Sequence, residues 1–315
     1  MQIIQFCLEM TVMMGAGVIA GRSGIADSAF AKKFSGLLVN LLIPCMVFTV
    51  MVNNYTAADL TISLAMMLGC IAVVGLGLLT AVTVRFLRRR KDDFSYLLLP
   101  MTMFMNANII GFPVIQALYG DSALVYANFF MIPYRPLFYT LMPLLTQGLS
   151  DNVDRSWWKA MLHALNTPSI YATFLGLFFA VTDLRLPVPV FSAIEKLGNT
   201  AIPLGMLACG MYVSDLKISR ALSRTEDWIA VICRNLLVPT FVLVLFLLLR
   251  VPTTVTKLCV IFAALPIPSM SALYASQYGR DSALAASSVF LSTALSVLSI
   301  PLWAMILEQI IKPIL

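Results

Sequence analysis

The sequence Tyr-Gly-Asp-Ser-Ala-Leu at residues 119–124 returns as Tyr-Gly-Arg-Asp-Ser-Ala-Leu at residues 278–284. A second pair, Asn-Leu-Leu-Ile-Pro at 40–44 and Asn-Thr-Ala-Ile-Pro at 199–203, has nearly the same separation of about 160 residues in a chain of 315. Two matches at one separation indicate two copies of one unit. We expect each copy to cross a membrane an odd number of times, so that the second is inverted relative to the first. This arrangement is typical of secondary transporters whose binding site lies where the halves meet.

The composition is that of a polytopic membrane protein. Apolar residues make up 60% of the chain and charged residues 11%, against about 45–50% and 25% in ordinary soluble domains. The net charge of +6 comes from basic residues between apolar runs, which favours contact with a membrane surface over nucleic-acid binding. Neither a disulfide framework, a metal site nor a cofactor is expected, because the six cysteines fall one per apolar segment. These are Cys7, Cys45, Cys70, Cys209, Cys233 and Cys259.

Ten segments are candidate membrane spans, five in each half, since a bilayer core of about 30 Å requires about 20 apolar residues per helix. The predicted fold is therefore all-α, with ten transmembrane helices in two inverted repeats of five. The first repeat is predicted at 1–150, a cytoplasmic linker at 151–160 and the second repeat at 161–315. The spans are predicted at 3–21, 34–52, 60–84, 95–118, 122–147, 161–182, 190–212, 228–250, 256–277 and 282–311.

The loops between these spans differ in basic content. Loops that follow odd-numbered spans hold 14 Lys or Arg, with the strongest block at 85–91, whereas the opposite side holds five. The positive-inside rule places the richer side in the cytoplasm. Both termini are then predicted on the outer side of the cytoplasmic membrane. The five opposite residues are Arg185, Lys196, Arg250, Lys257 and Lys312.

The fourth span is expected to break within residues 106–113. It contains Asn106, Asn108, Gly111 and Pro113, and asparagine and proline are unfavourable in a continuous lipid-facing helix. Pro113 is suited to the first turn of a new half-helix. The free N–H groups and positive dipole end of that half-helix would attract an anion.

The repeat predicts a matching break at residues 265–271, within the ninth span. This segment contains Pro266, Pro268, Ser269 and Ser271, and the helix after it should end at Tyr-Gly 278–279. Two half-helix N-termini, each with roughly half a positive charge, could hold a carboxylate. The alternative is a pair of structural kinks, because proline is common in transmembrane helices.

These segments resemble the auxin efflux carrier family, which also contains bacterial malonate and malate carriers. The resemblance covers essentially the whole chain. It implies ten helices in two inverted repeats, akin to bile-acid symporters and sodium/proton antiporters. It also implies a scaffold of helices 1, 2, 6 and 7, often the dimer interface, and a transport domain of helices 3–5 and 8–10 that binds substrate where helices 4 and 9 cross. The motifs are 106–113, 264–266, 275–279, 291–296 and 300–301.

Two departures from the family pattern concern the site. Plant members have a proline where Ser271 stands, so the hydroxyls of Ser269 and Ser271 are expected to bind freed backbone groups or the substrate. Plant members also have an acidic residue in the third helix. Residues 61–83 contain none, so the support site proposed for the family does not carry over.

Two arginines lie inside apolar spans, where a charge is costly. Arg135, between Pro133 and Pro136, is expected to pair with a substrate carboxylate or with carbonyls that the prolines leave free. Arg234 is a possible site residue, with snorkelling toward the headgroups as the alternative.

The remaining polar residues of the spans favour structural roles. Asn40 and Asn199 precede Pro44 and Pro203 at equivalent places of the repeat, and all four are expected to stabilise kinks. Glu9 and Glu308 are expected near the outer surface, and His163 at an interface, because none has an evident partner. No buried Asp or Glu is evident as a coupling site.

We therefore expect a secondary carrier for small organic anions, carboxylates or dicarboxylates such as malonate or malate, that works by alternating access as a homodimer. Uptake coupled to Na⁺ or H⁺ is the alternative, and cation/proton antiport is a further one. A channel would need continuous polar-lined helices. An intramembrane enzyme would need a nucleophile with a base or a metal cluster, and the sequence provides neither.

Overall fold

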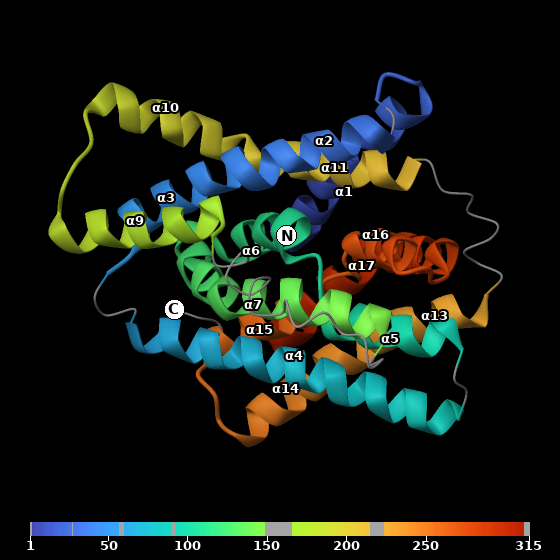
Figure 1. Ribbon diagram of the computed structural model, residues 1–315. Helices are drawn as coiled ribbons and strands as arrows, with labels where there is room; N and C mark the ends of the chain where they lie inside the picture. The colour runs from blue at the N-terminus through green and yellow to red at the C-terminus, as the bar shows by residue number, and fades with distance from the viewer. Residues whose placement is uncertain are drawn as a thin grey trace. The chain divides into compact units, whose positions relative to one another are not determined.

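The computed structural model describes residues 2–26, 28–56, 60–89, 92–148, 166–214 and 224–311. Every regular element in these ranges is helical (Figure 1). The predicted linker at 151–160 and His163 lie outside the described residues.

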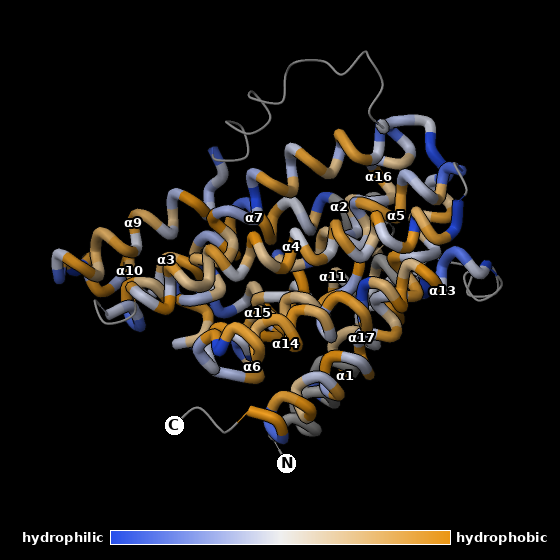
Figure 2. Tube along the Cα trace, turned by 90° about the horizontal axis from the view of Figure 1, so that it is seen from below, coloured by the Kyte–Doolittle hydropathy of each residue, from blue (hydrophilic) through white to orange (hydrophobic). Residues whose placement is uncertain are grey.

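Five helices are long and apolar enough to cross a membrane. Hydrophobic residues run along the helices, and hydrophilic residues gather mainly near helix ends (Figure 2). The fold is thus an all-helical one that suits a polytopic membrane protein, while the ten spans and the inverted repeats remain predictions. The five helices are Lys33–Asn54, Leu60–Arg88, Asp93–Tyr119, Thr225–Leu248 and Ser282–Ile310, and three shorter apolar helices are Val12–Arg22, Pro168–Thr182 and Thr253–Ala264.

The chain divides into two compact units. Unit 1 comprises Met1–Met67, Asn108–Ile132 and Leu165–Asp215, and unit 2 comprises Leu68–Ala107, Pro133–Ala164 and Leu216–Leu315. Two long helices, α4 (Leu60–Arg88) and α7 (Asp121–Gln147), begin in unit 1 and end in unit 2.

Unit 1 is built on two helix pairs. In one, α1 packs along α11, and in the other α3 packs along α9, with α10 beside α3. Glycines allow the close approach: a Cβ on Gly17 would lie 2.2 Å from the carbonyl oxygen of Leu207, and one on Gly176 would lie 3.0 Å from that of Phe48. Small residues at such contacts are the usual basis of helix packing in membranes. The elements are α1 (Gln2–Arg22), α2 (Ser28–Leu37), η1 (Leu38–Leu42), α3 (Ile43–Asn54), α6 (Phe112–Tyr119), α9 (Pro168–Thr182), α10 (Val188–Asn199) and α11 (Ala201–Ser214).

Unit 2 surrounds a buried apolar core to which α5, α13 and α17 contribute. Lys257, expected at the outer edge of the ninth span, is buried within a helix. It lies in α15 with its side chain 1% exposed, and its Nζ donates to Oε1 of Glu308 on α17 at 2.7 Å. The elements are α5 (Asp93–Met103), α13 (Thr225–Ile232), η4 (Cys233–Leu237), α14 (Val238–Leu248), α15 (Thr253–Ala264), α16 (Met270–Gln277) and α17 (Ser282–Ile310).

Three π turns each end two residues before a proline. They are η1 before Pro44, η3 (Ala107–Gly111) before Pro113 and η4 before Pro239. Proline has no N–H, and its ring clashes with the carbonyl four residues earlier. A wider turn moves that carbonyl aside, and the residue before the proline then bonds five residues back, as Ile43 N–H does to Leu38 and Val238 N–H to Cys233.

Candidate functional site

The second predicted break is present, and the first helix is interrupted upstream of the predicted place at 106–113. After α5 ends at Met103, the backbone of Phe104 is extended (φ −110°, ψ 157°), and η3 and α6 then carry the chain to Tyr119. After α15 ends at Ala264, Leu265 is extended (φ −64°, ψ 149°), and α16 follows from Met270 to Gln277. The first break lies at 104–106, upstream of the predicted centre, because the π turn accommodates Pro113 without ending the helix.

The two interruptions are joined directly within unit 2. The N–H of Asn106 donates to the carbonyl of Pro266 at 2.9 Å. Gly111, one of the residues of the predicted break, has ordinary helical dihedrals (φ −64°, ψ −50°), so the chain does not break there.

Side chains bind the backbone groups that the interruptions leave free. Tyr134 accepts from the N–H of Met105 at 3.0 Å and donates to its carbonyl at 2.5 Å. Ser292 accepts from the N–H of Ile267 at 3.1 Å and donates to Oδ1 of Asn235 at 2.7 Å. Because an unpaired backbone group costs several kcal/mol away from water, these two hydroxyls stabilise the interrupted geometry.

Arg234 holds the carbonyl ends of both interrupted helices. Its side chain is completely buried. It donates to Thr102 in α5 at 2.8 Å, to Phe262 in α15 at 3.1 Å and to Leu265 at 3.0 Å. The C-terminal ends of two helices carry partial negative charge, which balances the guanidinium. The alternative of snorkelling to the headgroups is therefore wrong.

Tyr134→Phe is expected to lower the stability of the protein by about 1–3 kcal/mol, because the buried N–H and carbonyl of Met105 lose their shared partner. The measurement is the melting temperature of the purified protein in detergent. Tyr55→Phe is the control, since the ring of Tyr55 stacks on Phe129 with centroids 6.0 Å apart and that contact survives the change. Equal melting temperatures for the two variants would contradict the role of Tyr134.

Ser271 provides an unused hydroxyl at the start of α16. The side chain is 2% exposed, and its Oγ has no hydrogen-bond partner among the residues that the structure describes. Its N–H, in the first turn, donates to the carbonyl of Pro268 at 3.0 Å. Ser269 is the N-cap residue and makes no side-chain cap bond. A buried hydroxyl without a partner is unfavourable by itself, so Ser271 is suited to a bound ligand.

Arg135 belongs to the same unit as Ser271. Its side chain is 4% exposed in α7, which remains helical through Pro133 and Pro136. Tyr139 lies one turn along α7 from Arg135, and Tyr274 lies on α16. Tyr274 follows Ser271 by three residues and therefore lies on the same helix face.

In unit 1, the predicted residues Asn108 and Pro113 line a cavity of about 10 Å³, roughly the room for one water molecule. Ile43 and Ile202, which precede the repeated prolines Pro44 and Pro203, line the same cavity. Residues of both matching sequence stretches, 40–44 and 199–203, therefore lie beside Asn108.

Asn40 and Asn199, which occupy equivalent places in the sequence repeat, have different local surroundings. Asn40 is exposed, and its Nδ2 donates to the carbonyl of Gly36 at 2.8 Å in its own helix. Asn199 is exposed at the end of α10, where the chain turns at Thr200 before α11. The chain thus turns between two helices before Pro203, whereas a π turn within a continuous helix precedes Pro44.

Sequence reasoning missed Tyr134, Asn235, Ser292 and the fully buried carboxylate of Asp227. Asn235 shows why. Its carbonyl, four residues before Pro239, accepts from Nε1 of Trp303 at 3.0 Å, a contact across 68 residues of sequence that no local pattern indicates. The one available signal was the Ser-Thr pair 292–293 of the last span, which served only to identify the family resemblance.

Comparison with known proteins agrees with this architecture. The family model described as "Membrane transport protein" matches residues 2–157 and 152–304. An uncharacterized transporter of Methanothermobacter thermautotrophicus is 25% identical over 95% of this chain and 97% of its own length. One of Methanocaldococcus jannaschii is 23% identical over 95% and 97%. A rice protein named "Probable auxin efflux carrier component 9" is 24% identical over 44% of this chain and 34% of its own length. The chain therefore belongs to the membrane transport protein family, which the resemblance to auxin efflux carriers had indicated.

Proposed function

We propose that this membrane transporter is a secondary carrier for small organic anions, carboxylates or dicarboxylates such as malonate or malate. The observation that carries the proposal is the buried Ser271 hydroxyl, which has no partner in the described part of the chain. It lies in the first turn of α16, at the positive end of the helix dipole. A carboxylate oxygen could accept from this hydroxyl and from the free amides of the turn.

Arg135 supports a dianionic substrate. A buried guanidinium can bind a carboxylate through two parallel hydrogen bonds. Arg135 lies in the same compact unit as Ser271, and both side chains are buried. We assign the first carboxylate to Ser271 and the second to Arg135, with Asn106 of the same unit as a further hydrogen-bonding group.

Alternating access by two inverted repeats is part of the proposal. Both halves have an interrupted helix that ends at Tyr-Gly, with positive φ at Gly120 (79°) and Gly279 (66°). The pairing of α1 with α11 is matched by that of α9 with α3, as expected if the first and sixth spans are equivalent and the second and seventh are too. A site between repeats allows each half to open in turn.

We further propose a scaffold from predicted spans 1, 2, 6 and 7 that forms a homodimer in the cytoplasmic membrane with both termini outside. In support, unit 1 contains the helices at those four places. Unit 1 also contains Asn108–Ile132, which the proposal assigns to the transport domain. The hinge between the scaffold and the transport domain would then lie within α7.

Ser271→Ala is expected to weaken malonate binding about tenfold or more, because a hydrogen bond to a charged group contributes about 1.5–3 kcal/mol. Its melting temperature without ligand should stay close to wild type, since the hydroxyl has no protein partner to lose. The measurements are malonate-dependent thermal stabilisation of the purified protein and malonate counterflow in proteoliposomes.

Ser276→Ala is the matched control, because Ser276 lies on the same helix with an exposed side chain. If Ser271→Ala and Ser276→Ala bound malonate, malate and acetate with the affinity of wild type, the proposed site would be wrong.

A further inference from the structure

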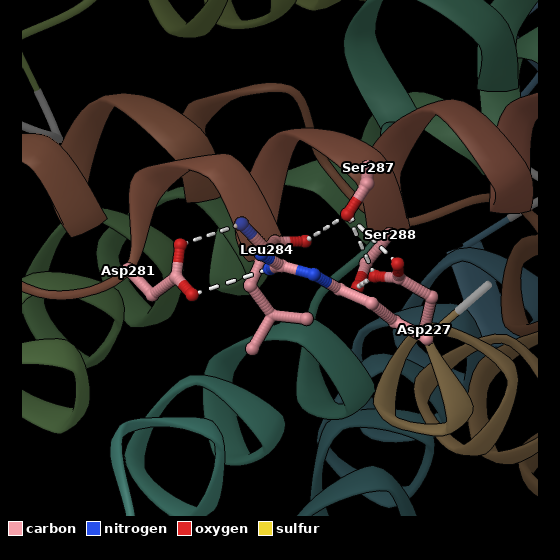
Figure 3. Close-up of polar contacts among 6 residues, drawn as sticks. Asp227, Asp281, Leu284, Ser287 and Ser288 are labelled. Carbon is pink, nitrogen blue, oxygen red and sulfur yellow. Dashed lines mark hydrogen bonds and ion pairs between the residues drawn. The ribbon is translucent and has the colours of Figure 1, made fainter. Parts of the chain in front are cut away.

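Among the residues that the structure describes, the buried carboxylate of Asp227 is hydrogen-bonded only by hydroxyls. Asp227 lies in the first turn of α13 with its side chain 0% exposed. Ser287 of α17 lies with its Oγ 2.9 and 2.8 Å from the two carboxylate oxygens, and Ser288 donates to Oδ1 at 2.5 Å. Figure 3 shows both serines pointing at Asp227 from the neighbouring helix.

The cluster contains more acceptors than protons. Ser287 has one hydroxyl proton, but three oxygens lie within its reach, the two of Asp227 and the carbonyl of Leu284 at 3.0 Å. Ser288 supplies one more proton. When Asp227 is ionised, the cluster has two hydroxyl protons for five oxygens, namely the two of the carboxylate, the two of the serines and the carbonyl of Leu284. The Leu284 carbonyl therefore loses the hydroxyl whenever Ser287 turns to the carboxylate.

A third proton satisfies the whole cluster. Protonated Asp227 donates through Oδ2 to Ser287, Ser287 donates to the Leu284 carbonyl, and Ser288 donates to Oδ1, so that each O–H has its own acceptor. After the proton leaves, Ser287 turns to Oδ2. Both states are hydrogen-bonded, and they differ by one proton and one rotated hydroxyl.

The spacing favours a proton over a metal ion. Oxygens that bind a metal at about 2.3–2.6 Å are held more than about 3 Å from one another by the size of the ion. The oxygens here are 2.5 to 3.0 Å apart, which is the range of a direct hydrogen bond.

The surrounding charges leave this carboxylate without an ion pair in the described part of unit 2. Arg224 donates to Asp281 at 3.2 Å, and Glu226 forms an ion pair with Arg88 at 3.5 Å. Arg88 also lies 3.6 Å from Asp92, and Arg280 binds Asp93 at 2.9 Å. The cations near Asp227 thus have other carboxylate partners.

We propose that Asp227, with Ser287 and Ser288, is the site at which the carrier binds and releases a proton during transport. This inference rests on the proposed function for its cargo. A proton that moves with an organic anion cancels one charge, and each charge is worth about 2.3 kcal/mol per 100 mV of membrane potential. A dicarboxylate that moves with one proton carries one net negative charge instead of two, so the electrical cost of its uptake into a negative interior falls by that amount. The proton comes from the solution on one side and leaves to the solution on the other.

Infrared difference spectroscopy of the purified protein tests the site without any substrate. A pH step should produce a carbonyl band of a protonated carboxylic acid that shifts in heavy water. Asp227→Asn should remove this band. The amide mimics the protonated acid, since its oxygen accepts from Ser288 and its N–H group donates to Ser287, so this variant is expected to fold. Ser288→Ala should shift the band and keep it.

Glu226→Gln is the matched control, a neighbouring carboxylate-to-amide change with 32% side-chain exposure, and the band should persist in it. A second measurement follows the internal pH of proteoliposomes after malonate addition. Wild type should move protons with malonate, and Asp227→Asn should reduce that movement to the level of empty vesicles.

The outcomes separate the two proposals. A band lost only in Asp227→Asn, together with malonate-driven proton movement, supports both. The same band without malonate transport supports the proton site and contradicts the proposed cargo. A band absent from wild type or retained in Asp227→Asn overturns the proton site, whatever the transport result.

Discussion

Arg234→Ala is expected to leave little folded protein after purification. The side chain donates to three backbone carbonyls at 2.8–3.1 Å in a fully buried place. Hydrogen bonds to a charged group contribute about 1.5–3 kcal/mol each, so the combined loss should be roughly 4 kcal/mol or more. The ends of α5 and α15 would then expose unpaired carbonyls to an apolar surrounding.

Arg234→Lys distinguishes the contribution of the positive charge of Arg234 from that of its side-chain geometry. A lysine keeps the positive charge but lacks the planar fork that reaches several acceptors at once, so we expect an intermediate melting temperature. Arg185→Ala is the control, because that side chain is 87% exposed. The measurement is the yield of monodisperse protein on size-exclusion chromatography, together with its melting temperature. A melting temperature of Arg234→Ala equal to that of Arg185→Ala would contradict a structural role for Arg234.

The interruptions could be predicted from sequence because their causes are local. Pro266 lies within the second interruption and removes a backbone donor there. The repeat then gave a reason to expect a break in the other half, which lies upstream of Pro113 because the π turn accommodates that proline. The groups that bind the freed backbone could not be predicted in this way. Arg234 contacts Thr102 across 132 residues, and Tyr134 contacts Met105 across 29. Such pairings depend on packing that periodicity does not encode.

Charges near span ends were the least predictable feature. Lys257 was expected among the basic residues of the outer side, and Asp227 was not singled out, although each stands within a few residues of a predicted span boundary. A shift of one turn decides whether such a side chain faces water or a neighbouring helix, and span boundaries have errors of that size. In their buried positions, Lys257 forms an ion pair with Glu308, and the carboxylate of Asp227 accepts from the hydroxyl of Ser287.

Gly210→Val is expected to disrupt unit 1. A Cβ at Gly210 would lie 2.0 Å from the carbonyl oxygen of Met14 and 2.9 Å from the Cα of Gly17. Both neighbours are backbone atoms of α1, so no side chain can rotate away, and the two helices must separate. Overpacking in a core costs about 1–3 kcal/mol, and a forced backbone shift along the α1–α11 contact should cost about 3 kcal/mol or more.

Gly15→Ala is the matched control for Gly210→Val, because Gly15 lies on α1 with no atom within 4 Å of its added Cβ. Alanine favours a helix over glycine by about 1 kcal/mol, so this variant should melt at or above the wild-type temperature. Gly210→Ala should already fall below wild type, since the clash begins at Cβ. If Gly210→Ala and Gly15→Ala had the same melting temperature, α1 and α11 would not approach as closely as the glycines allow. The pairing of the first and seventh predicted spans would then lose its physical basis.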